Sequence, residues 1–112
     1  MYEYACTITR VVDGDTQHVN VDLGCDVHID LTLRLLGIDC PEMNTDEGVA
    51  AKEFAIAWFE DHDTNFGVFT LQTVKDHREK YGRYLATLVA DDGTTLNQAL
   101  LDAGLAVPYD PR

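Results

Sequence analysis

The chain is organised around RLLGIDCPE, residues 34–42, an apolar strand that carries one arginine and ends in two carboxylates. Asp39 and Glu42 are three residues apart, and a turn that contains Pro41 separates them. Apolar runs are normally buried, so this ending crowds negative charge at the edge of a core, which is unfavourable unless a cation or a hydrogen-bond network balances it. A second acidic pair, Asp13-Gly14-Asp15, lies upstream in a turn. We therefore expect the fold to bring the two acidic turns together around a metal ion.

The segment before this stretch alternates apolar and polar residues and predicts a strand over residues 27–35. Its odd-numbered residues should face a core, so Arg34 should face the other way, on the side where Asp39 and Glu42 emerge. Taken alone, an arginine at such a position is more often simply exposed to solvent. Similar patterns predict strands over residues 3–12, 19–23, 67–74 and 81–90.

Two segments have helical periodicity. Residues 48–62 place alanines and Trp58 on one face, which we interpret as core packing. Thr95 followed by Gln98 is a capping-box signature for a short amphipathic helix that Gly104 should end. The tail from Leu105 should be irregular. Five strands, with one helix after the third and one after the fifth, predict a mainly β fold with helices: a five-stranded OB-fold barrel plus two α-helices, forming one domain over residues 1–112.

Composition limits the possible functions. The formal net charge is −12, from 8 basic and 20 acidic residues, whereas nucleic-acid binders are usually basic. Half of the basic residues fall in one short stretch, however: Lys75, Arg78, Lys80 and Arg83. The three cysteines have no CxxC spacing, so we expect buried or partly buried free thiols rather than disulfides or a zinc site. Neither a membrane span nor a signal peptide is visible, so we expect a cytoplasmic protein with no membrane partner.

The polar residues suggest a metal-assisted reaction on phosphate. Asp15 and Asp39 are hard oxygen donors and suit calcium or magnesium better than zinc, with a backbone carbonyl after Asp39, waters and a substrate phosphate oxygen completing the shell. Glu42 is the candidate base, which could accept a proton from an attacking water or orient it. The alternative is an acidic residue at a helix N-terminus that interacts favourably with the helix dipole. Arg34 and Arg83 could clamp phosphate oxygens through their planar guanidinium groups.

Four segments in order resemble the staphylococcal nuclease (thermonuclease-like) family: VVDGDT (11–16), RLLGIDCPE (34–42), KYGRYLA (80–86) and LNQALLDAGLA (96–106). The resemblance implies an OB barrel and calcium-dependent hydrolysis of DNA and RNA. By motif, Asp15, Asp39 and the backbone carbonyl of Cys40 correspond to metal ligands, although the family usually has threonine in place of Cys40. Arg34, Glu42 and Arg83 correspond to the catalytic residues, Lys80 and Tyr81 to residues that hold a terminal phosphate, Asp13 to the surroundings of the metal, and Tyr109 to a base-stacking tyrosine.

We therefore expect a calcium-dependent nuclease that acts on DNA, RNA or both as a monomer, with Mg²⁺ or another divalent cation ranking below Ca²⁺. Two alternatives stay open. One is a non-catalytic OB-fold module that binds nucleic acid or protein, and it is disfavoured by the intact set of polar residues. The other is an acidic DNA mimic, which would draw on the net charge alone.

Overall fold

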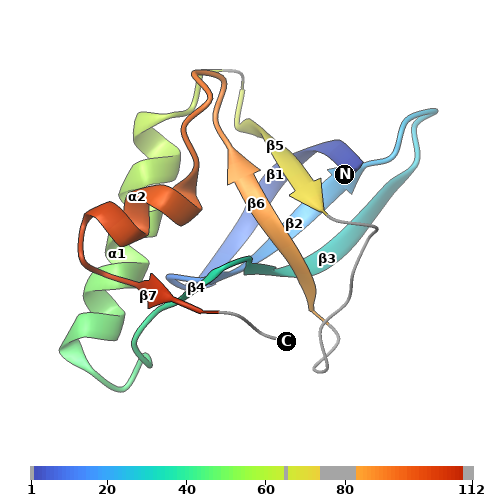
Figure 1. The fold of residues 1–112 in the computed structure, drawn as a ribbon. Helices are drawn as coiled ribbons and strands as arrows, with labels where there is room; N and C mark the ends of the chain where they lie inside the picture. Colours follow the sequence, from blue (N-terminus) through green and yellow to red (C-terminus); the bar gives the residue numbers. More distant parts are fainter. Residues whose placement is uncertain (1, 65, 74–82, 110–112) are drawn as a thin grey trace.

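The alternating strands predicted from the sequence close into a barrel with two helices on one side (Figure 1). The structure is a computed structural model and describes residues 2–64, 66–73 and 83–109. Within these ranges, the barrel strands follow the order β1-β2-β3-β6-β5, and β3 and β6 form the parallel pair. The predicted fold class is confirmed. The elements are β1 (Tyr2–Asp13), β2 (Thr16–Asp22), β3 (His28–Leu35), β4 (Ile38–Asp39), α1 (Asp46–Asp61), β5 (Val68–Thr73), β6 (Tyr84–Val89), α2 (Leu96–Asp102) and β7 (Val107–Pro108).

Strand β3 has the predicted alternation, but only its second half enters the core. Leu33 and Leu35 are fully buried, whereas Val27 and Ile29 are 50% and 39% exposed, so the prediction that all odd positions face a core is wrong for the first half. The reason is the pairing: β6 joins β3 only at residues 33–35, while β2 pairs with it from residue 28 onward. The β2–β3 hairpin therefore projects beyond the closed part of the barrel (Figure 1).

The three cysteines differ in their exposure to solvent. Cys6 and Cys40 are buried free thiols, as predicted, and burial raises the pKa of Cys6 to about 12. Cys25 is an exposed free thiol, contrary to the prediction, because it lies in the turn at the projecting end of the hairpin. Its φ of 55° is in the left-handed region, which a non-glycine residue adopts mainly in tight turns.

Both predicted helices form with small differences at their ends. Helix α1 begins at Asp46, two residues earlier than predicted, because the side chain of Thr45 caps it by accepting a hydrogen bond from the Gly48 N–H. Ala51, Ala55 and Trp58 pack into the core as predicted. Helix α2 has the predicted cap at Thr95 and ends before Gly104, whose φ is 74°. Among the described residues, neither α1 nor α2 could span a lipid bilayer.

A short two-stranded sheet, β4 with β7, was not predicted. Ile38 pairs with Pro108 and Asp39 with Val107, and the Tyr109 N–H donates to the Gly37 carbonyl at 2.9 Å. The prediction of an irregular tail is therefore wrong at residues 107–108. This pairing holds residues 107–109 against the segment that carries the candidate metal ligand Asp39.

Candidate active site

The first acidic turn joins β1 to β2 and is tightly packed against its surroundings. The Asp15 N–H donates to Asp13 Oδ1 at 3.1 Å, and Gln17 Nε2 donates to the Gly14 carbonyl at 3.1 Å. A Cβ atom on Gly14 would lie 2.8 Å from the Ala51 Cβ and 2.9 Å from the Cys40 Sγ, closer than such atoms approach in proteins. The glycine between the two aspartates is therefore required for the turn to lie flat against α1 and the second acidic turn.

Arg34 joins the two acidic turns. Its Nη1 contacts Asp15 Oδ2 at 3.2 Å, and its Nη2 contacts Asp39 Oδ1 at 3.0 Å. Asp15 Oδ2 also accepts a hydrogen bond of 2.9 Å from the Cys40 N–H. The side chain of Arg34 is only 12% exposed, so the alternative that it is merely a solvated residue is wrong. The sequence placed Arg34 on the side of Asp39, and the structure adds that it binds both carboxylates at once.

The charge balance of this site is negative. Burial, together with the hydrogen bond and the charge of neighbouring Asp15, raises the pKa of Asp13 to about 6. Burial and the charges of the three aspartates also raise the pKa of the Cys40 thiol to about 12, so its sulfur is protonated at neutral pH and is a poor metal ligand. Burial is the largest cause of both pKa shifts, and the charges of the neighbouring aspartates add to it.

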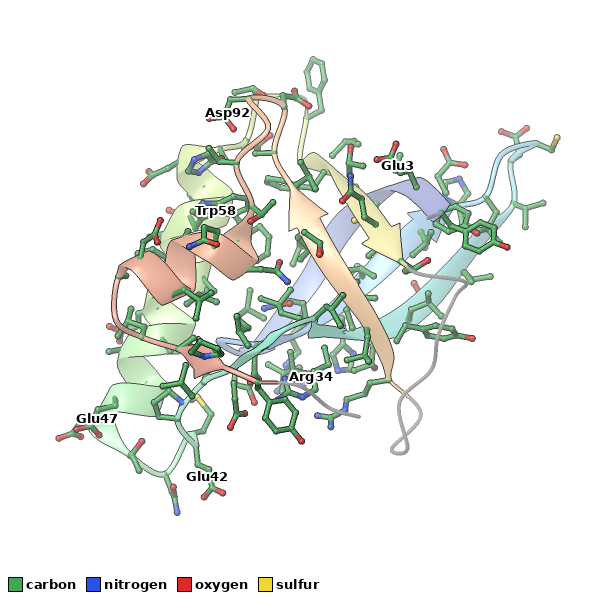
Figure 2. The ribbon with its side chains drawn as sticks, viewed as in Figure 1. Glu3, Arg34, Glu42, Glu47, Trp58 and Asp92 are labelled. Atoms are coloured by element: carbon green, nitrogen blue, oxygen red, sulfur yellow. The ribbon has the colours of Figure 1, made fainter. Side chains whose placement is uncertain are left out.

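Glu42 lies outside α1 and is exposed at the same end of the molecule as Arg34 (Figure 2). Its backbone carbonyl accepts hydrogen bonds from Thr45 Oγ1 at 2.6 Å and from the Thr45 N–H at 3.1 Å. Asp46 and Glu47 are the acidic residues of the first helical turn, so they rather than Glu42 occupy the positions that favour the helix dipole. The side chain of Glu42 therefore remains available for the role in proton transfer predicted from the sequence.

Arg83 immediately precedes β6, the strand that pairs with β3 in parallel, with Tyr84 opposite Leu33 and Leu85 opposite Arg34. Arg34 thus lies on β3, and Arg83 lies at the entrance of the adjacent strand β6. Lys80 and Tyr81, predicted to hold a terminal phosphate, lie outside the described residues, as do Lys75 and Arg78.

The ring of Tyr109 lies against Arg34, with the guanidinium carbon 5.4 Å from the ring centroid. This is the range of a cation–π interaction. The resemblance suggested only base stacking for Tyr109. The contact with Arg34 was missed because it depends on the β4–β7 pairing, and two-residue strands leave no periodic pattern in a sequence.

The carboxylates of Asp15 and Asp39 are oxygen donors of the kind that a hard divalent cation prefers, and they are two in number. Asp15 and Asp39 present oxygens that already bind one cationic group, and the Cys40 backbone lies beside them. No cluster of three or more His, Cys, Asp or Glu side chains arranged to bind a metal is found in the part of the chain that the structure describes. The protein would therefore supply two carboxylates, and backbone, water and substrate oxygens would supply the rest.

Comparison with known proteins identifies the class. Residues 32–112 match the family described as staphylococcal nuclease homologue, and the chain belongs to this family. The chain is also similar to proteins named "Uncharacterized endonuclease" from Escherichia coli O157:H7 and from Escherichia coli. Each is 30% identical over 92% of this chain and 60% of the relative. The chain thus spans about three fifths of the length of these curated relatives.

Proposed function

We propose that this domain is a calcium-dependent nuclease that hydrolyses phosphodiester bonds of DNA, RNA or both. The observation that carries the proposal is the bridging of Asp15 and Asp39 by Arg34, because it unites two carboxylates and a phosphate-binding group from separate parts of the chain. Membership of the staphylococcal nuclease homologue family, and the endonuclease name of the two relatives, support the same conclusion.

Asp15, Asp39 and the carbonyl of Cys40 would hold the cation. A bound calcium ion would polarise a phosphoryl oxygen and stabilise negative charge as it builds up. Asp13 would act indirectly, since its Oδ1 accepts from the Asp15 N–H and fixes the turn.

The remaining residues would act on the substrate. Glu42 would accept a proton from the attacking water or orient it. Arg34 and Arg83 would bind the phosphate oxygens on which charge develops in the transition state. Lys80 and Tyr81 would hold a terminal phosphate of the substrate.

The experiment is cleavage of plasmid, single-stranded DNA and RNA with calcium, with magnesium and with chelator. Wild type should cleave with calcium, and Glu42→Gln should lower kcat by roughly 10²- to 10⁴-fold, the usual contribution of a general base. Glu47→Gln is the matched control, since it removes an exposed glutamate from the adjacent first turn of α1. Absence of cleavage under every cation would favour the non-catalytic binding module, which a binding assay with labelled DNA and RNA would then test.

A further inference from the structure

Helix α1 contacts the backbone of both acidic turns through one face of its first two turns. Gly48 lies against the Pro41–Glu42 peptide so closely that a Cβ atom there would overlap the Glu42 carbonyl oxygen and lie 2.9 Å from that of Pro41. Ala51, three residues further on and therefore on the same face, is the residue that Gly14 abuts. The same helix thus supports the candidate base and the turn of the candidate metal ligand Asp15.

Thr45 links the backbone of Glu42 to the first turn of α1 by hydrogen bonds. Its hydroxyl donates to the Glu42 carbonyl at 2.6 Å and accepts from the Gly48 N–H at 3.0 Å, while its own N–H donates to the same carbonyl at 3.1 Å. One hydroxyl therefore caps the helix and ties Glu42 to it. Only Met43 and Asn44 lie between Glu42 and Thr45, so this short loop transmits the constraint directly.

We propose that Thr45 and Gly48 are positioning residues for Glu42, and that α1 sets the separation between Glu42 and the Asp13–Asp15 turn. This inference rests on the proposed nuclease function. Without this anchor, an exposed glutamate after a proline turn would sample many positions. Confining it to the one productive position in the transition state would then cost conformational entropy. Anchoring its carbonyl removes the backbone part of that freedom, and displacement of a catalytic group by about 1 Å can cost roughly 10²-fold in rate.

Gly48 gives the proposal a distinctive signature. Gly48 lies in the first turn of α1. At helical positions with free space beside them, replacing glycine by alanine is normally favourable, because alanine has the higher helix propensity. Gly48 is buried, and the Glu42 carbonyl group occupies the space that a side chain at position 48 would need. The added methyl group must therefore push Glu42 away from α1. Gly48→Ala should therefore lower kcat.

The test compares Thr45→Val with Thr95→Val. Thr95 is the matched control because it caps α2 in the same way, accepting from the Gln98 N–H at 3.1 Å, and does not contact the candidate site through any hydrogen bond that the structure describes. Both variants lose a helix cap of the same kind, and Thr45→Val also loses the hydrogen bond to the Glu42 carbonyl, which is the contact under test. Thr45→Val should lower kcat by about tenfold or more with little change in KM, as expected for a displaced base. Thr95→Val should leave kcat unchanged, and Thr45→Ser, which retains the hydroxyl, should restore it.

A second comparison uses Glu42→Gln as the background. If Thr45 acts through Glu42, then Thr45→Val should cause no further loss of kcat once Glu42 is replaced. Equal effects of Thr45→Val and Thr95→Val, or the same loss with and without Glu42, would overturn the inference.

An NMR measurement separates this inference from the proposed function. The carbonyl ¹³C resonance of Glu42 should shift in Thr45→Val and stay in place in Thr95→Val, because only the first removes a hydrogen bond to that carbonyl. A wild type that cleaves nothing would refute the nuclease proposal, whereas an unchanged Glu42 resonance would refute the anchoring by Thr45, whatever the activity.

Discussion

Replacement of Arg34 by glutamine tests whether the two acidic turns are built to share a cation. In chelator, Arg34→Gln leaves Asp15 without its guanidinium partner. Removing one member of a buried ion pair costs about 3–5 kcal/mol, and the side chains of Arg34 and Asp15 are only 12% and 10% exposed. The side chain of Asp39 is 50% exposed, so the loss of its ion pair with Arg34 should add at most about 1 kcal/mol to this cost.

We therefore expect a loss of roughly 3 kcal/mol in the free energy of unfolding without metal, or about 13 °C in Tm for a domain of this size. Calcium should stabilise both proteins by binding the folded state, and at about 100 times the Kd the gain approaches roughly 2.7 kcal/mol. The variant should gain more than wild type, because no guanidinium competes with calcium for Asp15 and Asp39.

The assay is urea and thermal unfolding in chelator and in a calcium series. Arg10→Gln is the control, because Arg10 is an exposed arginine on β1 and its replacement should cost at most about 0.5 kcal/mol. A loss in chelator no larger than that of Arg10→Gln, or equal calcium-induced gains in wild type and Arg34→Gln, would refute the shared-cation reasoning.

Three further predictions concern charge and the end of the chain. The pKa of Asp13 is raised from 3.8 to about 6 in the folded protein, so ionisation of Asp13 opposes folding. Asp13→Asn in chelator should therefore stabilise the protein by about 1 kcal/mol above pH 6, after allowance for the half-exposed side chain. Urea unfolding should show that this gain vanishes below about pH 4. Tyr109→Leu should cost about 1 kcal/mol in thermal unfolding through loss of the cation–π contact, whereas Tyr109→Phe should not; equal losses would contradict the contact. Cleavage should first rise and then fall with added salt, since screening at about 0.1 M weakens the long-range repulsion between a chain of net charge −12 and a polyanion; a rate that only falls would indicate that local basic residues dominate.

The barrel could be predicted from the sequence because the patterns that indicate its strands and helices are local. Alternation along residues 27–35 and the Thr95 cap both depend on neighbours within a few positions, and both elements formed. The exposure of Val27 and Ile29 was not predictable, because it depends on where β6 meets β3, which is a property of the closed barrel.

The candidate site divides in the same way. The residue types and their order identified Asp15, Arg34, Asp39 and Glu42, but not the contacts among them. That Arg34 binds both carboxylates, and that the backbone of Glu42 rests on Gly48, follow from three-dimensional packing. A glycine within a helix carries no sign in the sequence of what occupies the space beside it.

The pairing of β4 with β7 has a consequence for synthesis and folding. Asp39 is held opposite Val107, so this contact joins segments that leave the ribosome far apart in time. A nascent chain arrested before residue 107 could form β1, β2 and β3 but would lack the strand that holds β4 and the ring that covers Arg34. The longest-range pairing of the barrel, β1 with β5, needs only the chain up to residue 73, and β6 ends at residue 89, so every barrel strand is synthesised before β7. The candidate site should therefore mature last, after the barrel that carries it.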